Sequence, residues 1–208
     1  MMKPYAIALL VIALVWSTPV LAEEAQEFPG VSSGTVGAEL VIADFNSGDK
    51  PNNVGGDFGS WDKDPNDESQ GAKINFESGD ALGDDTGYSL RIDYDVDSSN
   101  PAYNGLWMKL QNLDATKYNT LSFYVRGDVQ RGFTKRVKIE LKDNSGQSSQ
   151  FIITGITEQW QKFSIPFEKF RRIKSWDALT EFVLVFDDIN TNPKTGSIYV
   201  DQIALSSE

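Results

Sequence analysis

From residue 39 onward, apolar and polar residues alternate in short runs, and clusters of Gly, Asn, Asp and Pro separate these runs. Strict alternation places every second side chain on the same face of a strand and is typical of sheets that cover a core on one side. The predicted strands span residues 39–45, 71–77, 88–96, 103–111, 119–126, 135–142, 149–155, 160–166, 180–187 and 196–205. A short helical turn is predicted around residues 166–172. About ten short strands predict an all-β protein with an antiparallel β-sandwich of the jelly-roll type.

The same alternation separates an inner from an outer face in the central strands. The predicted core-facing residues are Leu90, Ile92, Tyr94, Val96, Leu106, Met108, Leu110, Leu121, Phe123, Val125, Val137, Ile139 and Leu141. The opposite positions mix aromatic rings with long charged side chains. Such a face is solvated surface in most antiparallel sheets, but exposed aromatics also characterise binding clefts, so both interpretations stay open.

The last predicted strand, residues 196–205 with the sequence GSIYVDQIAL, breaks its own alternation. Ile198 and Val200 share one face, and the apolar pattern resumes one residue out of step at Ile203. A β-bulge inserts one extra residue into a strand and produces this slip. We therefore predict a bulge at Asp201 and the residue that follows it.

The N-terminal residues have the pattern of a secretory signal peptide. Lys3 provides the positive charge, and residues 5–16 are continuously apolar. Val20 and Ala22 then occupy the minus-three and minus-one positions of a cleavage site, where small residues are expected. Twelve apolar residues are too few to span a bilayer, which needs about 20. We therefore expect residues 1–22 to be a cleaved signal peptide, with an uncleaved anchor as the alternative.

The remaining chain is expected to be a flexible leader, residues 23–38, followed by a single β-sandwich domain, residues 39–208. Residues 23–38 are polar, small and aperiodic, as linkers are. A signal peptide predicts a periplasmic or secreted protein, with no membrane association after cleavage.

Composition narrows the possible partners and chemistry. The chain has 208 residues with 19 Lys and Arg against 30 Asp and Glu, a net charge of −11. An acidic protein repels nucleic acid and anionic lipid, and its charge disfavours self-association, so we expect a monomer without nucleic-acid partners. The sequence contains no Cys and no His. This excludes disulfides and Ser-His-Asp or Cys-His catalysis, and it leaves oxygen atoms as metal ligands, which favours calcium over transition metals.

Three segments carry a resemblance to a known family. They are LVIADFNSG at residues 40–48, ITEQWQKFSIPFEKFRRI at 156–173 and GSIYVDQIAL at 196–205. In their order and spacing, residues 39–205 resemble non-catalytic carbohydrate-binding modules with a galactose-binding-like jelly-roll fold, most closely the family 11 modules of β-glucanases. The resemblance implies a polysaccharide or oligosaccharide partner, with a β-glucan-like polysaccharide expected on a concave sheet face. It also implies a buried Trp160. Phe163, Ile165, Phe167 and Phe170 are expected to join Trp160 in the core.

The resemblance also implies a structural calcium ion between the first and last strands. The matching positions are Asp44, Asn46 and Asp201, and the predicted bulge would turn the Asp201 carboxylate toward such an ion. The family has an acidic residue where this chain has Asn46, which removes one negative ligand. The alternative is that Asp201 is a polar residue at a solvent-facing bulge that discourages edge-to-edge aggregation.

The predicted sugar site combines stacking platforms with polar groups for the hydroxyls. The outer positions of three central strands supply both kinds: Tyr103, Trp107, Lys109, Tyr124, Arg126, Lys138 and Glu140. Trp107 and Tyr124 are the predicted platforms and Arg126 the main polar anchor. Trp61 is expected at most at the edge of a cleft. The alternative for Trp107 is packing beneath a loop.

Function has two further alternatives. Thirty carboxylates permit a glycosidase pair, but the sequence lacks the Glu-x-Asp-x-x-Glu motif of jelly-roll β-glucanases and has no nucleotide-binding fingerprint, so we expect no enzyme. The same fold also resembles a domain associated with respiratory complex I assembly. The sheet would then hold a protein, so an assembly role is the second hypothesis.

Overall fold

Eleven β-strands form the part of the chain that the structure describes. The computed structural model describes residues 37–79, 81–83 and 87–207, so the predicted signal peptide and all but the last two residues of the predicted leader lie outside it. The strands are β1 (Glu39–Ala43), β2 (Phe58–Asp62), β3 (Gly71–Ser78), β4 (Tyr88–Asp95), β5 (Tyr103–Leu113), β6 (Thr120–Gly127), β7 (Arg136–Asp143), β8 (Ser148–Thr154), β9 (Gln161–Pro166), β10 (Leu179–Asp187) and β11 (Thr195–Ser206).

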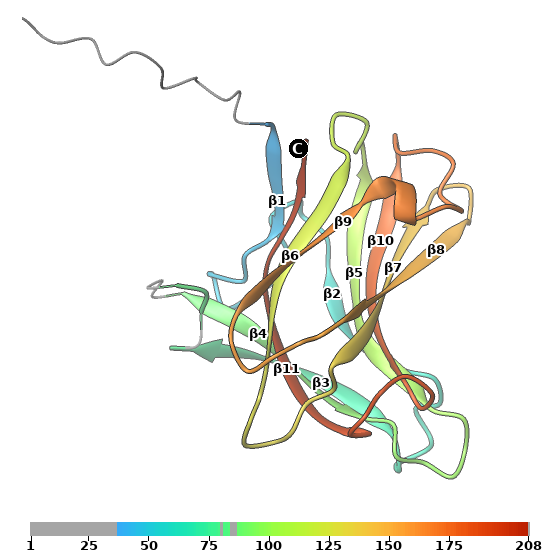
Figure 1. Cartoon of the computed structure of the whole chain (residues 1–208). Helices are drawn as coiled ribbons and strands as arrows, with labels where there is room; N and C mark the ends of the chain where they lie inside the picture. The colour runs from blue at the N-terminus through green and yellow to red at the C-terminus, as the bar shows by residue number, and fades with distance from the viewer. Residues whose placement is uncertain (1–36, 80, 84–86, 208) are drawn as a thin grey trace, which may run out of the picture. The chain divides into compact units, whose positions relative to one another are not determined.

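The strands form two antiparallel sheets that face each other across the core (Figure 1). One sheet has five strands in the order β2-β5-β10-β7-β8. The other has six, in the order β3-β4-β11-β6-β9, with β1 paired to β11. The predicted all-β antiparallel sandwich is therefore confirmed. The one helical element described is a single 3₁₀ turn, Phe167–Lys169, inside the predicted helical turn. No helix among the described residues is long and apolar enough to cross a membrane.

The sequence does not predict one of these strands, β2. β2 has only five residues, FGSWD, and it lies between segments rich in Gly, Asn and Asp, which are typical of turns. Gly59 also interrupts its alternation. β2 nevertheless pairs with β5 over its whole length and forms one edge of the five-stranded sheet. This matters for the site, because β2 carries Trp61.

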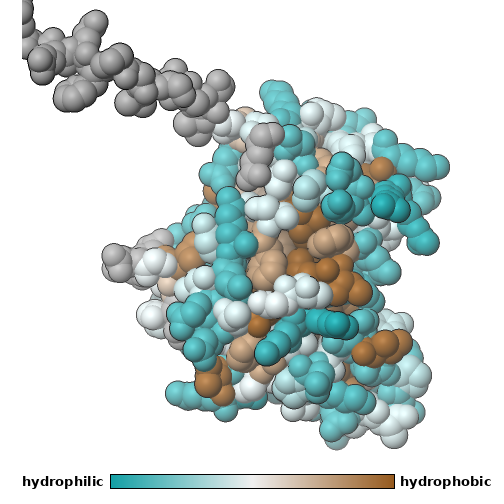
Figure 2. Space-filling model, in the orientation of Figure 1, coloured by the Kyte–Doolittle hydropathy of each residue, from teal (hydrophilic) through white to brown (hydrophobic). Residues whose placement is uncertain are grey.

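The core consists of the inner faces of the two sheets. Every residue predicted to face inward is buried, including Met108 of β5 and Phe123 of β6, both with no exposed surface. Phe163, Ile165, Phe167 and Phe170 also contact the core or lie within it, as predicted. Figure 2 shows further apolar surface in the region between the ribbons of β8 and β9, the two edge strands.

The prediction that Trp160 belongs to the core is wrong. Its side chain is only half-buried and lies outside the core cluster. Its ring centroid is 5.4 Å from the guanidinium carbon of Arg126, which projects from the outer face of the six-stranded sheet. Trp160 directly precedes β9, and it therefore covers a charged side chain outside the sandwich instead of filling the inside.

The predicted bulge in β11 is confirmed and has a topological reason. Its register with β6 shifts between Asp201 and Ala204, and Gln202 adopts a positive φ of 49°. Before the bulge, β11 pairs with β4; after it, β11 pairs with β1 along the same edge. The bulge marks the point where β11 changes partner, and both halves keep their apolar side chains in the core.

Candidate functional site

The register of the five-stranded sheet places aromatic, apolar and charged side chains in rows across its outer face. Residues paired directly across neighbouring strands point to the same side of a sheet. One row reads, in spatial order, Gly59, Trp107, Val183, Glu140 and Gln150. The next row on one side reads Trp61, Gly105, Val185, Lys138 and Ile152, and the next on the other side contains Lys109, Glu181, Lys142 and Ser148.

Two adjoining pockets lie on this face, and together they form what we call the aromatic cleft. The first has a volume of about 240 Å³ and is lined by Trp61, Trp107, Glu140, Lys142, Glu181 and Val183. The second, of about 440 Å³, is lined by Trp61, Pro101, Tyr103, Lys138, Glu140, Val185, Asp187, Asp188, Ile189 and Asn190. Trp61 and Glu140 line both pockets, so the two hollows adjoin and share part of their walls. An elongated ligand could follow them.

Trp107 has its ring fixed by its neighbours. Its indole Nε1 donates a hydrogen bond to the Ser60 backbone oxygen at 3.3 Å. The ring lies over Gly59, where a Cβ atom would approach the indole to 3.2 Å. The lack of a side chain at Gly59 thus lets the ring lie against β2. The ammonium groups of Lys109 and Lys50 lie 5.6 and 6.0 Å from the ring centroid. Trp107 thus lines a pocket, as a stacking platform would, whereas the alternative interpretation places it beneath a loop.

Trp61 and Tyr103 form the second aromatic group of the cleft. Their ring centroids are 5.8 Å apart with an interplanar angle of 59°. Tyr103 is 40% exposed, and the Lys63 ammonium lies 5.3 Å from its ring. Ile189, in the loop between β10 and β11, is 88% exposed and also lines this pocket. The floor beneath these groups is apolar, since Val185 is only 5% exposed although it faces outward.

The charged groups of the cleft are largely paired with one another. Glu181 accepts hydrogen bonds from the ammonium groups of Lys109, at 2.8 Å, and Lys142. Burial of the Glu181 carboxyl would raise its pKa, but the two lysines outweigh burial and hold the pKa below its ordinary value. Glu181 is therefore an anion that fixes both lysines.

Asp187 has a similar role at the other end of the cleft. Its carboxylate lies 3.0 Å from the Lys138 ammonium and accepts hydrogen bonds from the side-chain amide of Asn190. Burial opposes ionisation here too, yet these bonds lower the pKa of Asp187. In contrast, the Glu140 carboxylate has no hydrogen-bond or ion-pair partner among the described residues. Glu140 can thus accept hydrogen bonds from a ligand.

The structure separates the residues of the predicted sugar site into two groups. Tyr103, Trp107, Lys109, Lys138 and Glu140 all lie on the outer face of the five-stranded sheet, in β5 and β7. Tyr124 and Arg126 lie on β6, which belongs to the six-stranded sheet. The prediction that all seven share one face is therefore wrong. β5, β6 and β7 follow one another in sequence, but β6 crosses to the opposite sheet.

Arg126 is also engaged by its own surroundings. Its guanidinium carbon lies 3.8 Å from the centroid of the Tyr199 ring. The Tyr199 hydroxyl in turn donates to Asp128 at 3.3 Å, and Tyr199 is only 7% exposed. Arg126 thus covers an aromatic ring, and the predicted main anchor and the predicted platform Trp107 lie on opposite outer faces of the sandwich.

The three predicted calcium ligands occupy neighbouring positions in the fold. Asp44 directly follows the β1 residue Ala43, which pairs with Ile203 just after the bulge. The Asn46 backbone N–H donates to Asp44 Oδ1 at 3.2 Å. Asp201 is 2% exposed, and its two carboxylate oxygens accept hydrogen bonds from the backbone N–H groups of Gln202 and Leu82. The alternative of a solvent-facing Asp201 is therefore wrong.

Several residues of the cleft are absent from the sequence prediction. Trp61 was expected only at an edge, because its strand was not recognised. Glu181, Val183 and Asp187 lie on β10, whose run EFVLVF shows little polar alternation. This continuous apolar run could have indicated that β10 forms the floor of the cleft, because such runs are typical of central strands that are covered on both faces.

Comparisons with known proteins agree with the resemblance seen in the sequence. The family model "Carbohydrate binding domain 30" matches residues 51–207. No curated protein matches the chain. Among solved structures, a family 11 carbohydrate-binding module from Clostridium thermocellum, in complex with a β-1,3-1,4-mixed-linked tetrasaccharide, matches with a TM-score of 0.58 and 19% identity, over 83% of this chain and 96% of that one.

Two further structural matches extend the comparison. The CBM22-1 xylan-binding domain from Paenibacillus barcinonensis Xyn10C matches with a TM-score of 0.52 and 13% identity, over 83% of this chain and 97% of that one. An exo-β-agarase matches with a TM-score of 0.62 and 10% identity, over 81% of this chain but only 25% of the enzyme. At such identities these similarities establish a shared fold.

Proposed function

Because the chain belongs to the carbohydrate-binding domain 30 family, we propose that it is a non-catalytic binding protein that holds a β-glucan-like polysaccharide in the aromatic cleft. The observation that carries this proposal is the pair of adjoining pockets on the outer face of the five-stranded sheet, which share Trp61 and Glu140 as lining residues. The family 11 module with the same fold was solved with a mixed-linked tetrasaccharide, which makes a β-glucan the first ligand to test.

The chemistry of the cleft suits a sugar chain. The C–H face of a pyranose ring stacks on an aromatic ring, and Trp107 and Trp61 each present one over an apolar floor. Charged side chains bond the hydroxyls most strongly, and the Glu140 carboxylate and the Lys142 ammonium border the same pocket. Because the Glu181 carboxylate already fixes Lys109 and Lys142, binding orders few further side chains and costs little entropy.

The charge states in the cleft favour binding over hydrolysis. A glycosidase needs a carboxylic acid whose pKa is raised, so that it holds a proton for the leaving group. Glu181 and Asp187 have pKa values shifted in the opposite direction, because lysines and amides stabilise their anions. Two of the four carboxylates that line the cleft are thus unsuited to be the acid.

Affinity electrophoresis tests this function. The protein should migrate more slowly in a native gel that contains mixed-linkage β-glucan than in a gel without polymer, relative to a non-binding acidic marker. A parallel assay for reducing-sugar release should show no turnover. Unchanged mobility at high polymer concentration would contradict the proposal.

We also propose that Asp44, Asn46 and Asp201 hold a structural calcium ion. Their donors are carboxylate and amide oxygens, the type that calcium prefers, and the bulge brings β11 beside the end of β1. The described residues contain no group of three or more His, Cys, Asp or Glu that could hold a metal, so this site would rely on amide and backbone oxygens for its remaining ligands.

Thermal unfolding with and without a chelator tests the calcium proposal. Calcium bound only to the folded state raises the unfolding temperature by mass action, so excess EDTA should lower it and added calcium should restore it. The Asp44→Asn variant should respond less to either reagent. An identical melting curve in EDTA and in calcium would contradict the proposal. Export through residues 1–22 remains a separate prediction.

A further inference from the structure

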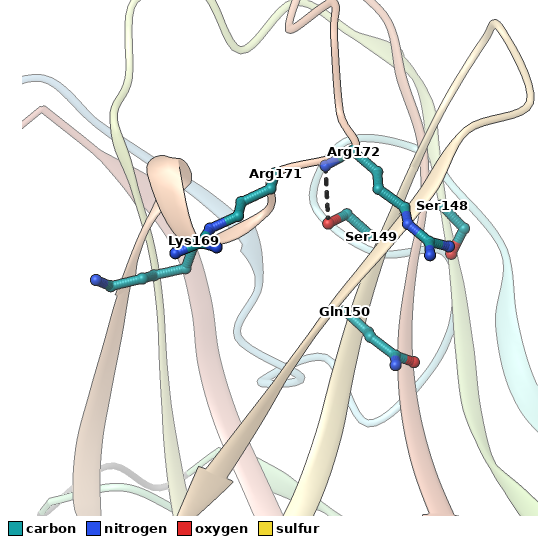
Figure 3. Close-up of a pocket in the computed structure, with 6 residues that line it drawn as sticks. All are labelled: Ser148, Ser149, Gln150, Lys169, Arg171 and Arg172. Atoms are coloured by element: carbon teal, nitrogen blue, oxygen red, sulfur yellow. Dashed lines mark hydrogen bonds between the residues drawn. The ribbon is translucent and has the colours of Figure 1, made fainter.

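A third pocket lies beyond the edge strand of the five-stranded sheet, between β8 and the turn that follows the 3₁₀ helix. Its volume is about 290 Å³, and it is lined by Ser148, Ser149, Gln150, Lys169, Arg171 and Arg172 (Figure 3). Unlike the aromatic cleft, it has no aromatic wall. We call it the cationic pocket, and its composition indicates a ligand group that is small, polar and negatively charged.

The local charge contrasts with that of the whole chain. The chain has a net charge of −11, yet three exposed cations, Lys169, Arg171 and Arg172, line this pocket. Lys169 pairs with the neighbouring Glu168 at 3.2 Å. Among the residues that the structure describes, no carboxylate pairs with Arg171 or Arg172. A guanidinium group binds carboxylate and sulfate oxygens with two parallel hydrogen bonds, so these arginines can recognise an anion.

The turn that carries the cations is held in place by the core. The side chains of Phe170 and Ile173 are buried, with 1% and 7% exposure. Backbone N–H groups of the same residues donate to the Phe167 and Phe170 oxygens at 2.9 and 3.0 Å. The Arg172 N–H donates to Ser149 Oγ at 3.2 Å, which ties the turn to β8 (Figure 3). A fixed backbone lowers the entropic cost of binding.

The pocket continues the rows of the aromatic cleft. Gln150 and Ser148 on β8 pair with Glu140 and Lys142 on β7, so their side chains point to the cleft side of the sheet. Figure 3 shows the Arg172 side chain running toward Ser148, whereas the Lys169 ammonium points away from β8. Three strand spacings, about 14 Å in all, separate the strand of Trp107 from β8.

We propose that the cationic pocket binds an anionic substituent, a carboxylate or sulfate, on a polysaccharide whose backbone lies in the aromatic cleft. The proposal rests on the proposed function and adds a ligand class to it. A chain crossing the strands from Trp107 over Glu140 to Gln150 reaches Arg172 at the edge of the sheet. Arg172 is the principal contact, and Ser148 and Gln150 donate or accept hydrogen bonds beside it.

Isothermal titration at about 0.15 M salt tests the proposal with matched polymers, because a Debye length of about 8 Å screens the repulsion between the acidic chain and an anionic polymer. The probes are mixed-linkage β-glucan, the same polymer with part of its primary hydroxyls oxidised to carboxylates, and the same polymer partly sulfated. An exposed ion pair contributes at most about 1 kcal/mol, so the wild type should bind the better anionic polymer roughly three- to fivefold more tightly than the neutral one. The preference should shrink in high salt. The stronger of the two anionic polymers identifies the substituent.

Two variants with the same change in net charge provide the control. Arg172→Gln should lose most of the preference and keep its affinity for the neutral polymer. Lys174→Gln removes an exposed cation that does not line the pocket, and it should keep the preference. Equal losses in both variants would mean that the preference comes from overall charge, and this result would overturn the proposal.

The remaining outcomes separate this proposal from the proposed function. Binding to the neutral polymer without any preference for an anionic one would overturn the cationic pocket and leave the cleft intact. Binding of anionic polymers alone, lost in Arg172→Gln, would support the pocket and contradict the cleft as a β-glucan site. Binding to none of the polymers would overturn both.

Discussion

The two outer faces of the sandwich have similar compositions but different arrangements. Both mix aromatic rings with Lys, Arg, Asp and Glu. On the six-stranded sheet, Arg126 lies 3.8 Å from the centroid of Tyr199, and Arg91 forms ion pairs with Glu77 and Asp93, the latter at 3.0 Å. On the five-stranded sheet, Trp61 and Trp107 line pockets. On the six-stranded sheet the Tyr199 ring is buried beneath Arg126, whereas on the five-stranded sheet Trp61 and Trp107 form the walls of a pocket.

This difference assigns separate roles to the two sheets. A polar or charged residue of the six-stranded sheet, such as the buried Asp201, serves the fold, and its loss should appear as lost stability. The loss of an aromatic ring that lines the aromatic cleft should appear as lost binding. Measurements of unfolding free energy and of ligand affinity on the same variants therefore test this division of roles between the two sheets.

The largest effect on stability is expected for Asp201→Ala. The carboxylate accepts hydrogen bonds from the backbone N–H groups of Gln202, at 2.7 Å, and Leu82, at 3.0 Å. Leaving two buried donors unsatisfied costs about 2–4 kcal/mol of unfolding free energy. Urea unfolding of both proteins in EDTA measures this cost independently of calcium, and the folded variant should still bind β-glucan. Equal unfolding midpoints would show that Asp201 has no such structural role.

A smaller effect, on affinity, is expected for Gly59→Val. A Cβ atom at Gly59 would lie 3.2 Å from the Trp107 indole, and a branched side chain needs still more space, so the ring must move. The loss of a stacking platform at the centre of a binding site typically weakens binding about tenfold or more. Titration with β-glucan measures the change. Gly71→Val in β3 of the six-stranded sheet serves as the control, because a Cβ atom there would make only an ordinary contact, at 3.6 Å from Asp62. Unaltered affinity would mean that the position of Trp107 does not determine binding.

The smallest expected effect is a pH-dependent change in unfolding temperature when Glu181 is replaced by Gln. Because its pKa is lowered in the folded state, the Glu181 ion pairs stabilise the protein above the unfolded pKa of about 4.3 and lose this contribution as the pH falls through the lower folded value. The wild type should therefore unfold at a higher temperature than Glu181→Gln at pH 7, and the difference should narrow below about pH 4. A difference that does not change with pH would contradict the ion-pair explanation.

The sequence predicts which side of each strand faces the core better than it predicts which strands pair with each other. Alternation identified the core sides of β4, β5, β6 and β7, and the slip in β11 revealed its bulge, because both depend on local geometry. The strand order is a long-range property: β10 lies between β5 and β7, and β11 lies between β4 and β6. Alternation within one strand contains no information about its neighbours.

The errors in the predicted site have the same origin. Alternation places Trp107 and Glu140 on the same outer face, as the structure does, but the prediction also groups Tyr124 and Arg126 with them because their strands are consecutive in sequence. Trp61 is expected only at the edge of a cleft, because β2 is short and contains Gly59 and is therefore not predicted as a strand. Whether an outward aromatic ring is accessible depends on contacts with distant residues, as Tyr199 under Arg126 shows.

The most direct test of the central claim compares Trp107→Ala with Tyr124→Ala. Both variants truncate one half-buried aromatic side chain, on the five-stranded and the six-stranded sheet respectively. Isothermal titration with mixed-linkage β-glucan should show at least a roughly tenfold loss of affinity for Trp107→Ala and wild-type affinity for Tyr124→Ala, both with unchanged circular dichroism. Retained affinity in Trp107→Ala together with lost affinity in Tyr124→Ala would contradict the assignment of binding to the aromatic cleft.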